Sequence, residues 1–251
     1  MKKQNPGVLA FGAHPDDVEL SVGGSLIVAH EAGLPIAVCH LTAGEMGTHG
    51  TASSRQQEAE TAARLLHADS MEILGLPDGR VSVDIESKDK IIRSIRRHQP
   101  RIILAPYWED LHPDHQAAGR LIKECAFLSG LAKWDTNQPA WRPDRVLYYM
   151  SHTQFEPDLI VDISEVIEAK RKAAEAYGSQ FHQAGSKERS TFISNSNFWH
   201  WWEGRAAYWG HLIGVAYGEP FSTNGPIPTR NPFAMFEGFG KYKNESTLEK
   251  Q

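Results

Sequence analysis

The chain has 251 residues, carries a formal net charge of −5 at pH 7 and is 41% apolar, so it is long enough to bury a sizeable core. Nucleic-acid binders are usually basic with clustered lysine and arginine, and this acidic balance argues against that class and favours a small-molecule function. The apolar runs are of strand length, well short of the roughly 20 residues that span a bilayer, so we expect no membrane partner.

The length suits one α/β domain, and we expect a single domain over residues 1–251 with a polar tail at about 241–251. The positively charged N-terminus leads into an apolar run without a small-residue cleavage site, which favours a cytoplasmic protein. The two cysteines, Cys39 and Cys125, are expected to be small buried residues rather than a disulfide or a metal-binding pair.

Strand-like apolar runs alternate with helical patterns through the first two-thirds of the chain, which is typical of βαβ units in a parallel sheet. In chain order, we expect strands over residues 7–13, 35–41, 70–74 and 101–105, and helices over about 18–31, from Ser53 or Ser54 to about 67, and over 88–98. After about residue 145 the pattern is less regular, with strands near 146–150 and 159–163 and a helix at about 165–179. The aromatic stretch at 198–202 is interpreted as a core or subunit-interface cluster, in preference to a platform for stacking sugars. The predicted fold class is α/β, a Rossmann-like, doubly wound, mostly parallel sheet with helices on both faces.

Two clusters of histidine and aspartate follow two of these strands. His14-Pro15-Asp16-Asp17 comes directly after the first strand, and Glu109-Asp110-Leu111-His112-Pro113-Asp114-His115 follows the strand at 101–105. Right-handed crossovers would make these strands neighbours at the topological switch point of the sheet, with their carboxyl ends side by side. The sequence therefore predicts that both clusters meet at one metal ion, and the remaining histidines and acids are interpreted as surface or core residues.

The residue types in the clusters suit a catalytic metal site, because catalytic zinc usually has three protein ligands and an open position for water. We predict His14, Asp17 and His115 as the ligands, which leaves Asp16 free to take a proton from the water and return it to a leaving amine. His112, if protonated, would stabilise the oxyanion of a tetrahedral intermediate, with Asp114 as its orienting partner. Either cluster alone could instead cap a helix, but two such clusters at two strand ends make that interpretation much weaker.

Further motifs extend this pattern along the chain. They are Ala13-His14-Pro15-Asp16-Asp17-Val18-Glu19, Gly44-Glu45-Met46-Gly47-Thr48 with Gly50-Thr51 and Arg55, Leu76-Pro77-Asp78-Gly79, His112-Pro113-Asp114-His115 and Ser179-Gln180-Phe181. Over about residues 8–221, the chain resembles the LmbE-like, or PIG-L, zinc-dependent N-deacetylases, which act on N-acetylglucosamine conjugates. The resemblance implies zinc on the three ligands named above, Asp16 as general base and His112 as the electrostatic partner of the intermediate. It also implies a role for Arg55 in substrate binding, and homo-oligomeric assembly.

Within that family the motifs are most similar to the bacillithiol-pathway branch, which implies hydrolysis of the acetamide of N-acetylglucosaminyl-malate. Position 111 departs from the pattern: Leu stands where close relatives often carry Arg, and this loss of a guanidinium weakens the implied malate recognition.

Several alternatives stay open. The substrate could be another N-acetylglucosaminide, such as an inositol conjugate, a chito-oligosaccharide or an antibiotic precursor, or the chain could be a non-catalytic metal-binding module. Binding of a nucleotide cofactor is disfavoured, since the first turn reads Gly12-Ala13-His14-Pro15 rather than a glycine-rich phosphate loop. A site with two histidines and an aspartate would also suit Fe(II), Co(II) or Mn(II) in place of zinc.

Overall fold

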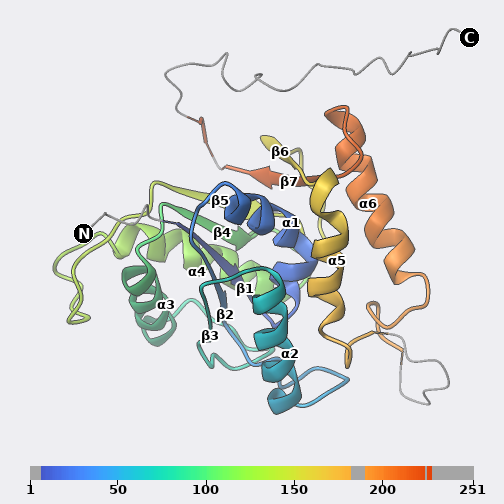
Figure 1. Cartoon of the computed structure of the whole chain (residues 1–251). Helices are drawn as coiled ribbons and strands as arrows, with labels where there is room; N and C mark the ends of the chain where they lie inside the picture. Colours follow the sequence, from blue (N-terminus) through green and yellow to red (C-terminus); the bar gives the residue numbers. More distant parts are fainter. Residues whose placement is uncertain (1–6, 182–189, 224, 228–251) are drawn as a thin grey trace, which may run out of the picture.

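A seven-stranded sheet forms the centre of the protein in the computed structural model, which describes residues 7–181, 190–223 and 225–227 (Figure 1). The tail expected at 241–251 lies outside these residues. The strands lie in the order β3-β2-β1-β4-β5-β7-β6. Their bounds are β1 (Val8–Gly12), β2 (Ile36–His40), β3 (Ser70–Ile73), β4 (Ile102–Pro106), β5 (Arg145–Tyr149), β6 (Leu159–Asp162) and β7 (Gly218–Ser222). The first five strands pair in parallel, and β7 runs antiparallel to β5 and β6.

Helices cover both faces of this sheet, which confirms the predicted α/β class (Figure 1). They are α1 (Asp17–Glu31), α2 (Ala52–Leu65), α3 (Ile85–His98), α4 (Pro113–Leu128), α5 (Ile167–Glu175) and α6 (Phe198–Leu212), with a short 3₁₀ turn η1 (Ser164–Val166) before α5. Alternate residues of β1 serve the two layers: Val8 and Ala10 pack with α1, α5 and α6, whereas Leu9 and Phe11 pack with α3 and α4. A strand buried on both faces reads as a continuous apolar run, which is why β1 was recognisable in the sequence.

The predicted contact between the first and fourth strands is confirmed. β1 and β4 are direct parallel neighbours, with Val8 opposite Ile102 and Ala10 opposite Leu104. Their carboxyl ends therefore lie side by side, and the residues that follow them, at the starts of α1 and α4, share one edge of the sheet. Open α/β sheets bind their ligands at such a switch point.

Three helix boundaries differ from the expected ones. Thr51, rather than Ser53 or Ser54, caps α2, because its hydroxyl accepts the Ser54 N–H at 3.1 Å while the Ser54 hydroxyl accepts the Thr51 N–H at 2.8 Å. This reciprocal pair satisfies two backbone donors that a cap further along would leave free. α3 begins at Ile85, before the expected residue 88, since Asp84 accepts the Ser87 N–H at 2.8 Å and caps it. α5 ends at Glu175, earlier than the expected 179.

β7 also anchors the helix that starts at the site. The carboxylate of Glu219 accepts the N–H groups of Gly24 and Ser25, in the middle of α1, at 2.9 and 2.7 Å. The ammonium of Lys170, on α5, lies 2.8 Å from the same carboxylate and over the ring of Trp202. All five of these residues except Ser25 are buried, so the network ties β7, α1, α5 and α6 together.

The remaining expectations about the core are met. Cys39 and Cys125 are buried free thiols. In the aromatic stretch, Phe198 and Trp202 belong to the core, whereas Trp201 is 45% exposed. Among the described residues, none of the helices combines the length and the apolarity that crossing a bilayer requires.

Candidate active site

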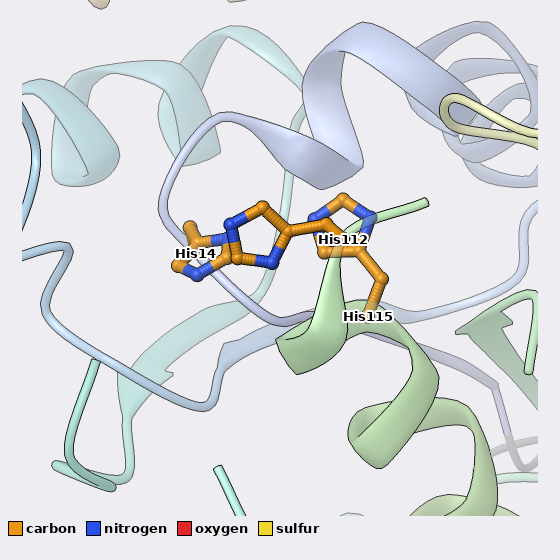
Figure 2. A group of neighbouring side chains, drawn as sticks. All are labelled: His14, His112 and His115. Carbon is orange, nitrogen blue, oxygen red and sulfur yellow. The ribbon is translucent and has the colours of Figure 1, made fainter. Parts of the chain in front are cut away.

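Both predicted clusters lie together at the carboxyl end of the sheet. His14 and Asp16 occupy the turn between β1 and α1, Asp17 is the first residue of α1, and His112 and His115 lie at the start of α4. Figure 2 shows the three imidazole rings close to one another, with His112 and His115 on the first turn of α4. The ring centroids are 4.8 Å apart for His14 and His112, 5.4 Å for His14 and His115, and 5.0 Å for His112 and His115.

Asp17 joins the two histidines that were predicted as ligands with it. Its Oδ2 lies 3.5 Å from Nδ1 of His14, and its Oδ1 lies 3.1 Å from Nε2 of His115. The three histidines also offer nitrogens that lie within 4.8 Å of one another. Two imidazoles and one carboxylate around a common point are a donor set that zinc and related divalent ions accept.

Further carboxylates lie behind these imidazoles. Nε2 of His14 is 3.1 Å from Asp78 Oδ1 and 3.2 Å from Asp114 Oδ2, while Nδ1 of His115 is 3.2 Å from Asp110 Oδ1. Each histidine thus has one nitrogen towards Asp17 and the other towards a carboxylate. This is the usual arrangement for a metal-binding histidine, whose second nitrogen donates its proton to an outer carboxylate or carbonyl.

The electrostatics of the cluster favour added positive charge. Burial lowers the pKa of His115, but Asp17 and Asp110 outweigh it and raise that pKa to about 9. The pKa of His14 is likewise raised, because Asp114, Asp17 and Asp78 outweigh burial. Both imidazoles are therefore cations at neutral pH when only protons are available. A divalent ion would replace those protons, since metal binding requires the neutral imidazole.

Asp16 has the geometry of a constrained, buried acid–base group. It stands at the N-cap position of α1 with φ of 106°, a left-handed conformation that costs a non-glycine residue free energy and that clusters at functional sites. Its side chain is buried, and Nη2 of Arg55 lies 3.0 Å from its Oδ2. Burial raises the pKa of Asp16 to about 6, against the opposing effect of Arg55. A carboxyl that titrates near pH 6 can both take and return a proton close to neutrality.

Arg55 is held in this corner of the protein by several hydrogen bonds. Besides Asp16, its guanidinium donates to the carbonyl oxygens of Pro15 and Gly44, and the residue is only 4% exposed. Gly44 has φ of +69°, and a Cβ there would lie 2.1 Å from Nη1 of Arg55, so only glycine leaves room for the guanidinium. The expected role of Arg55 was substrate binding; the structure places its guanidinium against Asp16.

His112 and Asp114 differ from the expected arrangement as well. Nδ1 of His112 accepts the backbone N–H of Asp114 at 3.2 Å, so the neutral ring carries its proton on Nε2. Burial, together with the nearby His14 and His115, lowers the pKa of His112, which favours the neutral donor over the expected cation. The Asp114 carboxylate does not orient His112; it accepts the N–H groups of Gly79 and Val81 at 2.7 and 3.2 Å.

The sequence analysis missed three residues of this site, Asp78, Asp110 and His40. Asp110 stands two positions before His112 and Asp78 stands in a quoted turn motif, so their positions were the available signal. His40, at the end of β2, is buried beside the turn, with Nδ1 3.1 Å from the His14 carbonyl oxygen. Burial lowers the pKa of His40 to about 4, so this ring is neutral and its Nδ1–H donates to that carbonyl, which helps to hold the His14 backbone.

The chain is similar to several known proteins. A family model described as PIG-L, GlcNAc-PI de-N-acetylase, matches residues 9–126, a range that contains every predicted site residue. The chain is similar to the diacetylchitobiose deacetylase of Thermococcus kodakarensis, with 29% identity over 231 residues that cover 84% of this chain and 80% of that protein. A probable N-acetyl-alpha-D-glucosaminyl L-malate deacetylase 2 of Bacillus cereus is 28% identical over 187 residues, which cover 69% of this chain and 83% of that protein. The solved structure of the conserved protein TT1542 from Thermus thermophilus matches with a TM-score of 0.82 and 35% identity, covering 91% of this chain and 98% of that chain.

Proposed function

The chain belongs to the PIG-L/LmbE-like deacetylase family, and from that premise we propose that it is a zinc-dependent enzyme that removes acetyl from an N-acetylglucosamine conjugate. The observation that carries the proposal is the position of Asp16, a buried carboxyl that titrates near pH 6, directly beside the cluster of His14, Asp17 and His115. A purely structural metal site has no use for such a group, because structural zinc is normally closed by four protein ligands.

The residues divide the work of amide hydrolysis among them. His14, Asp17 and His115 would hold the ion, which when bound supplies Lewis acidity towards a water molecule and the amide carbonyl. Asp16 takes a proton as the water oxygen attacks the carbonyl carbon, and returns it to the amide nitrogen as the C–N bond breaks. His112 donates from Nε2 to the oxygen of the tetrahedral intermediate, a role that a neutral imidazole fixed by the Asp114 N–H can fill.

For the substrate we favour a neutral N-acetylglucosaminide such as diacetylchitobiose over N-acetylglucosaminyl-malate. Arg55, the residue expected to bind a carboxylate, is buried against Asp16, and Leu111, next to His112, is 78% exposed and carries no charge. A similarity that covers most of the chain to a diacetylchitobiose deacetylase supports the same choice. The similarity to the Bacillus cereus protein keeps the malate conjugate as the second candidate.

A substrate panel tests the proposal. Zinc-loaded protein would be incubated with N-acetylglucosamine, N,N′-diacetylchitobiose and N-acetylglucosaminyl-malate, and the free amine measured, with Asp16→Asn as the inactive control. We expect the highest kcat/KM for diacetylchitobiose. Preference for the malate conjugate would reverse the substrate choice, and no amine release from any of them would refute the deacetylase proposal.

We propose that residues 1–251 form one deacetylase domain and that the protein works in the cytoplasm as a homo-oligomer. Sedimentation velocity would measure the oligomeric state directly.

A further inference from the structure

Asp110 is a buried carboxylate on which several donors from two loops converge. Its Oδ1 accepts the His112 N–H and the ring of His152, both at 3.0 Å, and its Oδ2 accepts the N–H groups of His152 and Thr153 at 2.9 and 3.3 Å. Oδ1 also lies 3.2 Å from Nδ1 of His115. Asp110 is 2% exposed, so these groups rather than water satisfy its charge.

The partners of Asp110 require both of its carboxylate oxygens to act as hydrogen-bond acceptors. Every group that faces Asp110 is an N–H donor, and an ionised carboxylate can only accept. An asparagine in its place would turn an NH₂ group towards at least one of those donors. The position therefore selects aspartate for its charge and its two acceptor atoms, beyond its size.

Because Asp110 can only accept hydrogen bonds, it also constrains the ring proton of His115. Nδ1 of His115 is buried and makes no aligned hydrogen bond in the structure, and Asp110 Oδ1 is the acceptor within reach at 3.2 Å. When His115 is neutral it carries one ring proton. Placing that proton on Nδ1 satisfies both atoms, and it leaves the lone pair of Nε2 facing Asp17 at 3.1 Å, where the ion of the proposed function would lie.

We propose that Asp110 is a positioning residue that holds the proton of His115 on Nδ1, so that Nε2 is presented to the metal ion as a ligand. The proposal rests on the metal site of the proposed function, but not on the identity of the substrate. The backbone N–H groups of His152 and Thr153 hold Oδ2 of the carboxylate, and therefore the backbone of the loop after β5 indirectly sets the geometry of the metal site.

The main test measures zinc affinity by competition with a chromogenic chelator, without any substrate. Asp110→Asn should weaken zinc binding by about 10- to 100-fold, the usual effect of losing the hydrogen-bond partner of a metal-binding histidine. His152→Ala removes one donor to the carboxylate and leaves the His115 contact, so its zinc affinity should stay within about threefold of the wild type. Asp144→Asn, at an exposed carboxylate paired with Arg101, is the matched surface control. Unchanged zinc affinity in Asp110→Asn would overturn the proposal, as would an equal loss in His152→Ala.

A second measurement does not depend on the variants folding. In zinc-loaded wild-type protein with ¹⁵N-labelled histidine, a ¹H–¹⁵N correlation spectrum should show the His115 proton on Nδ1, and this proton should exchange slowly with water. A proton on Nε2 would overturn the proposal. Full zinc retention in His115→Ala would instead refute the metal site of the proposed function, and amine release by the wild type would then have to be explained by other ligands.

Discussion

Replacing Arg55 with alanine removes the cation that faces Asp16. The two groups are 3.0 Å apart and both are buried, and at an effective dielectric constant of about 20 their attraction is roughly 5 kcal/mol. Removal of one partner of a buried pair typically costs about 3–5 kcal/mol, because the other charge is left uncompensated. The carboxyl can avoid this cost by binding a proton, so we expect the pKa of Asp16 to rise from about 6 by at least about one unit.

The pH profile of kcat/KM reports this shift. Asp16 must be ionised to act as a base, so in the wild type activity should fall as the pH drops through about 6, or lower when a divalent cation stabilises the carboxylate. In Arg55→Ala this limb should move to higher pH, with at least about a fivefold loss of kcat/KM at pH 6 and substantial recovery above pH 8. Arg64→Ala, an exposed arginine on the same helix, is the matched control. An unmoved limb, with losses confined to an acidic conjugate, would refute the reasoning and return Arg55 to substrate recognition.

Four other predictions follow from the site. Asp16→Asn should keep its zinc and lose at least about 10²-fold in kcat; loss of zinc, measured by elemental analysis, would make Asp16 a ligand. His112→Ala should lower kcat by about 10²- to 10³-fold with little change in KM, and the pH profile should keep its shape because this residue acts as a neutral donor; a lost basic limb would show that it acts as a cation. Zinc binding near pH 7 should release about two protons, from His14 and His115, and calorimetry in buffers of different ionisation enthalpy would count them; no release would mean neutral ligands. Burial raises the pKa of Glu19 to about 8, so the folded state favours the protonated form. The free energy of unfolding of the wild type should therefore fall as the pH rises from about 4.5 to about 8, by at most about 5 kcal/mol. Urea unfolding of Glu19→Gln should lack this decrease, and the same dependence of unfolding free energy on pH in both proteins would contradict the prediction.

The sequence predicts the six strands β1 to β6 and misses β7. Every residue of β1 is buried, so the strand appears as an unbroken apolar run. β7 reads Gly-Glu-Pro-Phe-Ser, and its glutamate is inside because Lys170 and two N–H groups of α1 neutralise it. That compensation comes from residues far away in the sequence, and no local pattern reveals it.

In the site too, some features follow from the sequence and others do not. The positions of His14 and His115 follow from strand order, because each stands a few residues after one of two neighbouring strands. The pairing of Arg55 with Asp16 and the direction of the Asp114 carboxylate depend on how loops fold back over those strand ends. Such contacts are set by loop conformation, and residue types alone left several partners equally plausible.

The anchoring of α1 by Glu219 has a consequence for the order in which the protein matures. The three proposed metal ligands, His14, Asp17 and His115, and the family match all lie before residue 127, so they are synthesised early. Yet the backbone donors of Gly24 and Ser25 find their acceptor only when Glu219 emerges, and until then Lys170 is a cation without its counter-ion. The helix that presents Asp17 is thus locked by one of the last described residues to be synthesised. A shorter chain that ended with the family match would contain all three proposed metal ligands but would lack Glu219, which anchors the helix that begins at Asp17.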